Sequence, residues 1–390
     1  MTRFLTRLLG RLPIGWLQLV HNRARFAAAL AGVAFANVLV FVQIAIMGSM
    51  ATATIQPYRF FDADIMISAA DANAIAEGSH VPRQWLFQSL AHPQVASGTP
   101  LFVGNVSLQR HGRTISLTTF AIDPAAAEFY APDIARKSAM LRLPDSGIID
   151  INTRGLDRAE AALIRPQSPD IVEVRGRSLS LQDTFAGGGG FGADGFLIVS
   201  DQTFQHLVQQ RSSTAPDHIL LHVTGGADPE RVAADLRQIL PDDTLRIRTY
   251  AQAQREDVSY QQTKRPTGII FGFGVVIGIL VGLVIVYQVL STDVADHLRE
   301  YATFKAMGYR HRFLLGIVLE EAVILATLGA VPGTLIALGL VTGMRAATNL
   351  PLAITPTIVA MVFVGTLVAC ALSGTLATRR LASADPAELF

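Results

Sequence analysis

Four long apolar stretches interrupt an otherwise polar chain, at residues 26–48, 267–290, 313–344 and 354–378. A helix needs about 20 apolar residues to cross a bilayer, and each stretch is long enough. The first stretch also exceeds the roughly 7–15 apolar residues of a cleaved secretory signal, which favours an uncleaved anchor. The pattern therefore predicts four transmembrane helices.

The polar residues between the first two stretches, 49–266, show two repeats of a strand, helix, strand pattern. The segments are residues 62–68, 82–92 and 100–108 in the first unit, and residues 218–224, 228–240 and 244–250 in the second. Two such units predict a ferredoxin-like subdomain, interrupted at about 109–216 by a second, more β-rich subdomain. The predicted fold is an α-helical membrane protein with a large α+β extracytoplasmic domain between its first two membrane helices.

Composition and charge add a topology to this pattern. Only 16% of the residues are charged, below the roughly 25% of soluble proteins. Basic residues mark the predicted cytoplasmic segments 1–25, 291–312 and 379–390, whereas the short loop 345–353 has only Arg345. Both termini are therefore predicted to be cytoplasmic, with residues 1–25 as an amphipathic segment on the membrane lipid.

The polar domain lacks the motifs of common catalytic and metal sites. The glycine run at residues 186–195 has no following lysine, which excludes a phosphate-binding loop. His218 and His222 fall on a predicted strand, ~13 Å apart, too far for one metal ion. The single cysteine, Cys370, excludes an internal disulfide. We therefore expect no catalytic residue, no bound cofactor, no metal and no nucleic-acid partner.

Four polar residues stand out within the apolar stretches: Asn37, Gln43, Glu320 and Glu321. For the glutamates, three interpretations stay open: interfacial acids paired with loop arginines, a hinge or contact with the cytoplasmic loop, or a proton relay. The relay has the least support, because the apolar stretches contain no further acid. Whether Asn37 and Gln43 pair across a dimer also stays open.

The third stretch contains Pro332 between Gly329 and Gly333. Proline removes a helical hydrogen bond and clashes with the preceding turn. The pattern therefore predicts that the third membrane helix breaks or bends here.

A charged segment between the second and third stretches is predicted to form a cytoplasmic helix over residues 293–309. Apolar residues recur there at a spacing of three, at Leu298, Tyr301, Phe304 and Met307. Gly308 is the expected stop, because glycine tolerates the left-handed conformation that ends many helices. From the pattern alone, this helix is either a connector on the lipid surface or a docking helix for a cytoplasmic partner.

Residues 296–333, "DHLREYATFKAMGYRHRFLLGIVLEEAVILATLGAVPG", resemble the FtsX/MacB-like permease domain of ABC transporters. In that family an R-E-x-x-x-x-[KR]-x-x-G segment precedes an E-A pair and glycines in span three. The matching positions are Arg299, Glu300, Lys305, Gly308, Glu321, Ala322, Gly329 and Gly333. The segments 13–46 and 379–390 look like the DevC branch, the permeases of heterocyst-type glycolipid exporters.

The resemblance implies a homodimer in the cell inner membrane, driven by a separate ABC ATPase that uses ATP and Mg²⁺. The implied ATPase-coupling residues are Arg299, Glu300, Tyr301, Phe304, Lys305, Met307 and Gly308. The implied hinge or contact residues of span three are Glu320, Glu321, Gly329, Pro332 and Gly333. The DevC branch further implies a HlyD-like membrane-fusion adaptor, a TolC-like outer-membrane channel and export of a glycolipid or another amphiphile.

Other functions remain open at this stage. An FtsX-like signalling scaffold would activate an external cell-wall hydrolase without moving a substrate, and a lipoprotein extractor would share the four-span plan. The external domain, with its two predicted subdomains, favours docking of an adaptor. A membrane-embedded enzyme would need a nucleophile and base or a metal cluster, for which the sequence has no motif.

Overall fold

The computed structural model describes residues 14–110, 112–188, 190–241 and 243–378, apart from the side chains of Lys305 and His311. The chain divides into two compact units. The helical unit comprises residues 1–48, 269–344 and 352–390, and the α+β unit comprises residues 49–268 and 345–351. Each unit is treated by itself.

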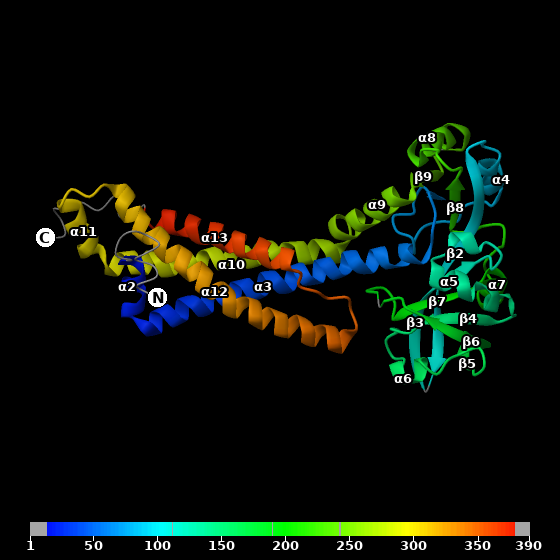
Figure 1. Ribbon diagram of the computed structural model, residues 1–390, viewed down its shortest axis with the longest axis horizontal. Coiled ribbons are helices and arrows are strands. Elements are labelled where there is room, and N and C mark those ends of the chain that lie inside the picture. Colours follow the sequence, from blue (N-terminus) through cyan, green and yellow to red (C-terminus); the bar gives the residue numbers. More distant parts are fainter. Residues whose placement is uncertain (1–13, 111, 189, 242, 379–390) are drawn as a thin grey trace. The chain divides into compact units, whose positions relative to one another are not determined.

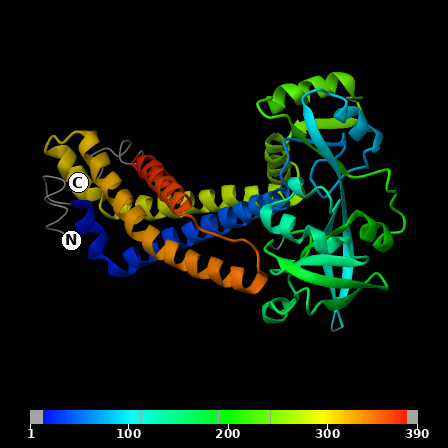
Figure 2. The ribbon, with the colours of Figure 1, turned by 45° about the vertical axis from the view of Figure 1, so that its right-hand side comes forward.

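Six helices carry the described part of the helical unit: α2 (Ile14–His21), α3 (Arg23–Ile55), α10 (Pro266–Asp296), α11 (Leu298–Ala306), α12 (His311–Thr348) and α13 (Pro356–Ala377). Helices α3, α10, α12 and α13 are long and apolar enough to cross a membrane by length and composition. The four apolar helices expected from the hydropathy pattern are therefore confirmed. The four lie side by side (Figures 1 and 2).

The interior of this bundle is built from small and aliphatic side chains. Ala29 and Val33 of α3, Leu290 of α10, Leu325 of α12 and Cys370 of α13 belong to one buried cluster. Cys370 is a buried free thiol in this cluster. In lipid, the hydrophobic effect does not drive helices together, and small residues favour association because they let the helices approach closely.

The single helix predicted over residues 293–309 is wrong in its first part. Helix α10 continues to Asp296, and α11 begins at Leu298 after a turn at His297. The prediction used the loss of hydropathy after Leu290 as a boundary. No glycine or proline stands between residues 290 and 297 to stop a helix, so α10 extends beyond its apolar part.

The first part of the α+β unit contains β1 (Ile65–Ala69), α4 (Gln84–Leu90), β2 (Val95–Arg110), β8 (His218–Val223), α8 (Pro229–Ile239) and β9 (Leu245–Thr249). The strands lie in the order β2-β8-β1-β9, and all neighbours are antiparallel. This is the arrangement of two split β-α-β units. All six elements overlap the predicted segments, and Asp228 caps α8 by accepting from the Glu230 N–H.

The inserted part is a closed ring of six strands. Strand β2 joins β3 (Arg113–Ile122), β4 (Ser146–Asp150), β5 (Asp170–Val174), β6 (Arg177–Phe185) and β7 (Gly195–Ser200). The order is β2-β3-β7-β4-β6-β5, and β5 pairs back with β2 at Leu108 and Val174. The short helices of this part are α5 (Pro132–Lys137), α6 (Arg158–Ala161) and α7 (Asp201–Leu207), with 3₁₀ turns at Ala127–Phe129 and Ser138–Arg142.

Strand β2 belongs to both parts of the unit. Its residues 95–101 pair with β8, and its residues 102–110 pair with β3. The predicted boundary near residue 109 therefore falls inside a strand, because one uninterrupted strand serves two sheets. Helix α9 (Tyr250–Thr263) and the 3₁₀ turn η1 (Gln56–Phe60) complete the unit.

Aromatic rings fill the core next to the ring of strands. Phe60 lies 5.2 Å from both Phe185 and Phe196 and 6.0 Å from Phe120, measured between ring centroids. Phe120 also contacts Phe61. These are edge-on arrangements of the kind that adds to the free energy of apolar burial.

Replacing Phe120 by alanine removes a fully buried ring from this cluster. We expect Phe120→Ala to lower the free energy of unfolding of the α+β unit by about 3–5 kcal/mol, as measured by urea unfolding of the purified chain. Phe87 is 64% exposed on α4 and is the matched control. Phe87→Ala should change the free energy of unfolding by less than about 0.5 kcal/mol, and equal effects of both variants would contradict the assigned core.

Candidate functional site

Helix α11 ends as the sequence predicted, at a left-handed glycine. Gly308 has φ +88°, and the N–H of Tyr309 donates to the carbonyl oxygen of Phe304 at 3.1 Å. This bond closes the helix C-terminus in the Schellman pattern. The chain then turns into α12, which begins at His311.

One face of α11 is anchored in the helical unit. Tyr301 is fully buried and packs with Val294 of α10 and with Leu314, Ile317 and Val318 of α12. Leu298 and Phe304 are partly buried against the same cluster.

Met307 does not share this face, although the spacing of three suggested it. Its side chain is 60% exposed. An α-helix turns about 100° per residue, so nine residues after Leu298 the side chain points to the opposite side. A spacing of three therefore describes an apolar stripe that drifts around the helix.

The C-terminal end of α11 presents an apolar surface, the exposed rim, which we define as Met307 and Tyr309. Tyr309 is also exposed, and its ring lies 4.6 Å from that of Phe313 and 5.7 Å from that of Phe304. Arg299 and Glu300 are exposed on the same short helix. The side chain of Lys305 lies outside the described part of the chain.

Gln18 of α2 was missed by the sequence analysis and ties α2 to α11. Its Nε2 donates to Oε2 of Glu300 at 3.0 Å, and its Oε1 accepts from the Tyr301 hydroxyl at 3.3 Å. Burial, followed by the nearby charges of Glu321 and Asp293, raises the pKa of Tyr301, so the phenol stays protonated as a donor at neutral pH. A lone glutamine in an N-terminal segment carries no sequence signal for such a role.

One face of helix α2 packs against the bundle, and the prediction that residues 1–25 lie on the membrane surface stays a prediction. Gly15, Gln18 and Leu19 are buried. A Cβ added at Gly15 would lie 2.9 Å from Cγ of Glu321, so the absence of a side chain there lets α2 approach α12. Residues 1–13 lie outside the described part.

The two glutamates of α12 differ in their surroundings. Oε1 of Glu320 accepts from the backbone N–H of Trp16 at 3.5 Å. Glu321 is 0% exposed and interacts with the carboxyl group of Asp293. Asp293 lies on α10, so the sequence argument that the membrane helices contain no second acid is wrong. The apolar boundary had placed Asp293 in the loop.

Gly329 and Gly333 are contact positions between α12 and α3. A Cβ at Gly329 would lie 2.7 Å from Cγ1 of Val33, and a Cβ at Gly333 would lie 3.0 Å from the carbonyl oxygen of Ala34. Two small residues four apart are a common close-packing device between membrane helices. Helix α12 continues through Pro332, so it does not break there, and a bend at this position stays a prediction.

Asn37 pairs within the chain. Its Oδ1 accepts from the Thr366 hydroxyl of α13 at 2.6 Å. Gln43 lies against Gly274 of α10, where an added Cβ would come within 2.6 Å of its side-chain amide. Both amides therefore meet other helices of the same chain.

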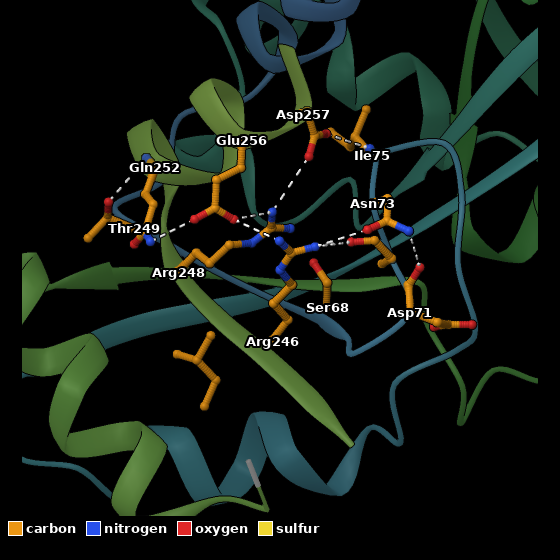
Figure 3. A network of polar contacts seen from close by, with 12 residues as sticks. Ser68, Asp71, Asn73, Ile75, Arg246, Arg248, Thr249, Gln252, Glu256 and Asp257 are labelled. Atoms are coloured by element: carbon orange, nitrogen blue, oxygen red, sulfur yellow. Dashed lines mark hydrogen bonds and ion pairs between the residues drawn. The ribbon is translucent and has the colours of Figure 1, made fainter. Parts of the chain in front are cut away.

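A polar network in the α+β unit, which sequence reasoning also missed, surrounds Arg248 and Asp257 (Figure 3). Asp257 of α9 accepts from the Tyr58 hydroxyl and, at 2.8 Å, from the backbone N–H of Ile75. Arg248 of β9 is 3% exposed and lies between Asp257, at 3.6 Å, and Glu256, at 3.2 Å. The network joins η1, α9 and β9 through buried charges.

Burial raises the pKa of Asp257 to about 6, and the Tyr58 hydroxyl and Arg248 offset only part of this rise. Glu256 is more open to solvent. Burial raises its pKa, but the contacts with Gln252, Arg248 and Arg246 together outweigh this and lower the pKa overall. Folding therefore shifts the pKa values of these two adjacent acids in opposite directions.

The described residues hold no group of three or more His, Cys, Asp or Glu side chains placed to bind a metal ion. His218 is buried, with Nδ1 2.9 Å from Oγ of Ser68 and Nε2 2.8 Å from the carbonyl oxygen of Ile75. Both ring nitrogens thus have protein partners, which is a structural role.

Residues 272–386 match the family model described as FtsX-like permease C-terminal. The matched region contains α11, α12, α13 and most of α10, so the site around α11 lies inside it. This part of the chain is therefore similar to FtsX-like permeases, in agreement with the resemblance found in the sequence. No curated protein matches the chain.

Solved structures are similar to parts of the chain at low identity. The periplasmic region of MacB from Actinobacillus actinomycetemcomitans is 9% identical with a TM-score of 0.37, and the match covers 50% of this chain and 92% of that chain. The extracellular domain of the ABC-type transporter YknZ from Gram-positive bacteria is 10% identical with a TM-score of 0.34, covering 48% of this chain and 98% of that chain. These likenesses carry no argument about function.

The opposite titration of Asp257 and Glu256 predicts a pH dependence of stability. A carboxyl group with a higher pKa in the folded state than in the unfolded state stabilises the folded protein. This contribution is complete below the unfolded pKa, near 4, and is lost as the pH rises through the folded pKa of about 6. Asp257→Asn should remove this loss. Between pH 4 and pH 8, wild type should lose roughly 3 kcal/mol of unfolding free energy relative to the variant, at about 1.4 kcal/mol per pKa unit.

Urea unfolding of the purified chain at a series of pH values, followed by circular dichroism, measures this difference. Glu256→Gln is the matched control, and its difference from wild type should depend on pH in the opposite sense. A carboxyl group with a lowered folded pKa stabilises the folded protein above its unfolded pKa, and this contribution is lost as the pH falls. Parallel pH profiles for wild type and Asp257→Asn would contradict the assignment.

Proposed function

We propose that the chain is the permease subunit of an ABC export system, and that a separate cytoplasmic ATPase drives it through α11. The observation that carries the proposal is the two-sided character of α11. Tyr301 anchors one face of α11 against α10 and α12. Arg299 and Glu300 are exposed on the helix, and Met307 and Tyr309 are exposed directly after its end. A short helix that is anchored in the bundle and exposed at its end can transmit a movement of the ATPase to α10 and α12.

The family match supports the permease part of this proposal, since α11 lies within the matched residues 272–386. Exposed aromatic and methionine side chains with charged neighbours are the composition of a protein contact surface. The rim therefore fits docking of a protein, which favours the docking helix over the simple lipid connector.

The proposal extends to the mechanism of transmission. The Arg248–Asp257 network fastens α9 to η1 and β9. In the chain, η1 directly follows α3, and α9 is followed by α10 after two residues. A movement of α3 or α10 would therefore reach the α+β unit at the Arg248–Asp257 network. This chain would then transmit motion between its two units without an internal substrate tunnel.

The remaining parts of the proposal rest on the DevC resemblance of the terminal segments: a homodimer in the inner membrane, a HlyD-like adaptor, a TolC-like channel, and export of a glycolipid or another amphiphile. The second candidate is an FtsX-like scaffold that activates an external cell-wall hydrolase. The two-part α+β unit favours the exporter, because it offers more surface for an adaptor. Mass spectrometry of what co-purifies with the gently solubilised chain separates the two candidates.

Glu300→Lys should uncouple transport from ATP hydrolysis. The change reverses the charge of the group that accepts from Gln18 Nε2, so α11 loses a tie to α2. We expect normal membrane insertion, continued ATP hydrolysis and loss of export, measured in vesicles that contain the chain with its ATPase. Glu300→Gln keeps an acceptor oxygen and is the control. Full export by the lysine variant would disprove the coupling role.

Met307→Glu should weaken docking of the ATPase. A charge in the middle of an apolar contact costs about 1–2 kcal/mol or more, which is about tenfold in affinity. The measurement is the amount of ATPase retained during affinity purification of the tagged chain. Met307→Leu preserves the apolar contact and should retain the ATPase. Equal retention by the glutamate variant would show that the exposed rim is not the docking surface.

A further inference from the structure

Two carboxyl groups meet in the interior of the helical unit. Asp293 of α10 is 4% exposed and Glu321 of α12 is 0% exposed, and each carboxyl group is among the groups that act electrostatically on the other. Within the described part of the chain, no N–H or hydroxyl donates to either oxygen of Glu321 or to Oδ2 of Asp293. A hydrogen bond between two carboxyl groups requires a proton on one of them, because an ionised carboxylate only accepts.

Among the residues that the structure describes, the groups around this pair do not supply a compensating positive charge to Glu321. The charges that act on it are Asp293 and Glu320, both acids. On α3, Arg25 is in contact with Asp296. His297 lies with Nδ1 3.7 Å from Oδ2 of Asp293.

The other facing groups come from α2 and α11. Gln18 is neutral and already engaged with Glu300 and Tyr301. His21 lines the cavity beside Asp293, and α13 contributes Leu367, Cys370 and Ala377, none of them charged, to the neighbouring apolar cluster. Two ionised carboxylates in this setting would repel each other without a cation in contact with Glu321, and one shared proton removes that repulsion.

A cavity with polar groups in its walls borders Asp293 and gives this member of the pair a route to water. It has a volume of about 150 Å³, and its walls include Asp293, His297, Asn22, Gln18 and Arg25. This volume exceeds what one water molecule requires, and the lining offers several hydrogen-bonding partners. A proton that leaves the pair can therefore pass to water in this cavity.

We propose that Asp293 and Glu321 form a proton-binding site, in which one proton is shared between the two carboxyl groups and sets the position of α11. Release of the proton leaves two carboxylates and transfers one proton to cavity water. The resulting repulsion acts between α10 and α12, the two helices whose residues Val294, Leu314, Ile317 and Val318 hold Tyr301. Deprotonation therefore loosens α11, and protonation locks it.

The proton site stands independently of the proposed function, whereas its effect on transport rests on α11 being the coupling helix. The first test uses the purified full-length chain in lipid nanodiscs without an ATPase, so a failure here is distinguishable from a failure of the export proposal. Infrared difference spectroscopy during a pH titration detects the carbonyl stretch of a protonated carboxyl group.

We expect wild type to show a buried carboxyl band that disappears as the pH rises. Both Glu321→Gln and Asp293→Asn should lack this band, and each is nearly isosteric with the residue it replaces. Glu320→Gln, one residue away on α12, is the matched control and should retain it. A band that survives in both Glu321→Gln and Asp293→Asn, or the absence of any titrating band in wild type, would overturn the proposal.

The second readout is hydrogen exchange of the α11 amides, corrected for the intrinsic pH dependence of exchange. In wild type, protection over residues 298–306 should fall at least tenfold across the pH range in which the infrared band disappears. In Glu321→Gln, which mimics the protonated site, protection should stay high at every pH. If wild type and Glu321→Gln change alike, the site does not control α11.

Discussion

A hydrocarbon environment offers no water to a buried polar group, and the arrangement of the helical unit depends on this constraint. Several of the polar side chains that turn inward have a partner on another helix. Thr366 donates to Asn37 across α13 and α3, and Ser373 donates to the carbonyl oxygen of Leu283 across α13 and α10 at 3.0 Å. These contacts set the rotation of the helices, while glycines set how closely the helices approach.

The same constraint explains why α11 is held in place. The hydroxyl of the buried Tyr301 needs an acceptor, and Gln18 provides it while also donating to Glu300. A helix of nine residues would be marginal in isolation. Anchoring by one aromatic residue and one amide makes it part of the bundle, while Met307 and Tyr309 at its far end remain exposed. The site is therefore a product of burial and of satisfied hydrogen bonds together.

The α+β unit follows a different logic, since water surrounds it and its core is ordinary apolar packing. Its charged interior is concentrated at Arg248, Glu256 and Asp257, where α9 meets β9 (Figure 3). Buried charges of this kind contribute little net stability, but removing one partner is strongly unfavourable. Their position on the element that precedes α10 suits a fixed attachment point better than a stabilising device.

The sequence by itself determined the four apolar helices, the two split β-α-β units and the glycine stop of α11, because each depends on local periodicity or on one backbone conformation. It also indicated the segment that contains the site, through the Arg299 to Gly333 motif. Only the tertiary structure decided that α10 runs on to include Asp293, that Glu321 meets it, that Gln18 bridges α2 and α11, and that β2 serves two sheets. Those features arise from contacts between residues far apart in the chain. Hydropathy and residue spacing describe neighbours along the chain. They carry no information on the distance between side chains that only folding brings together.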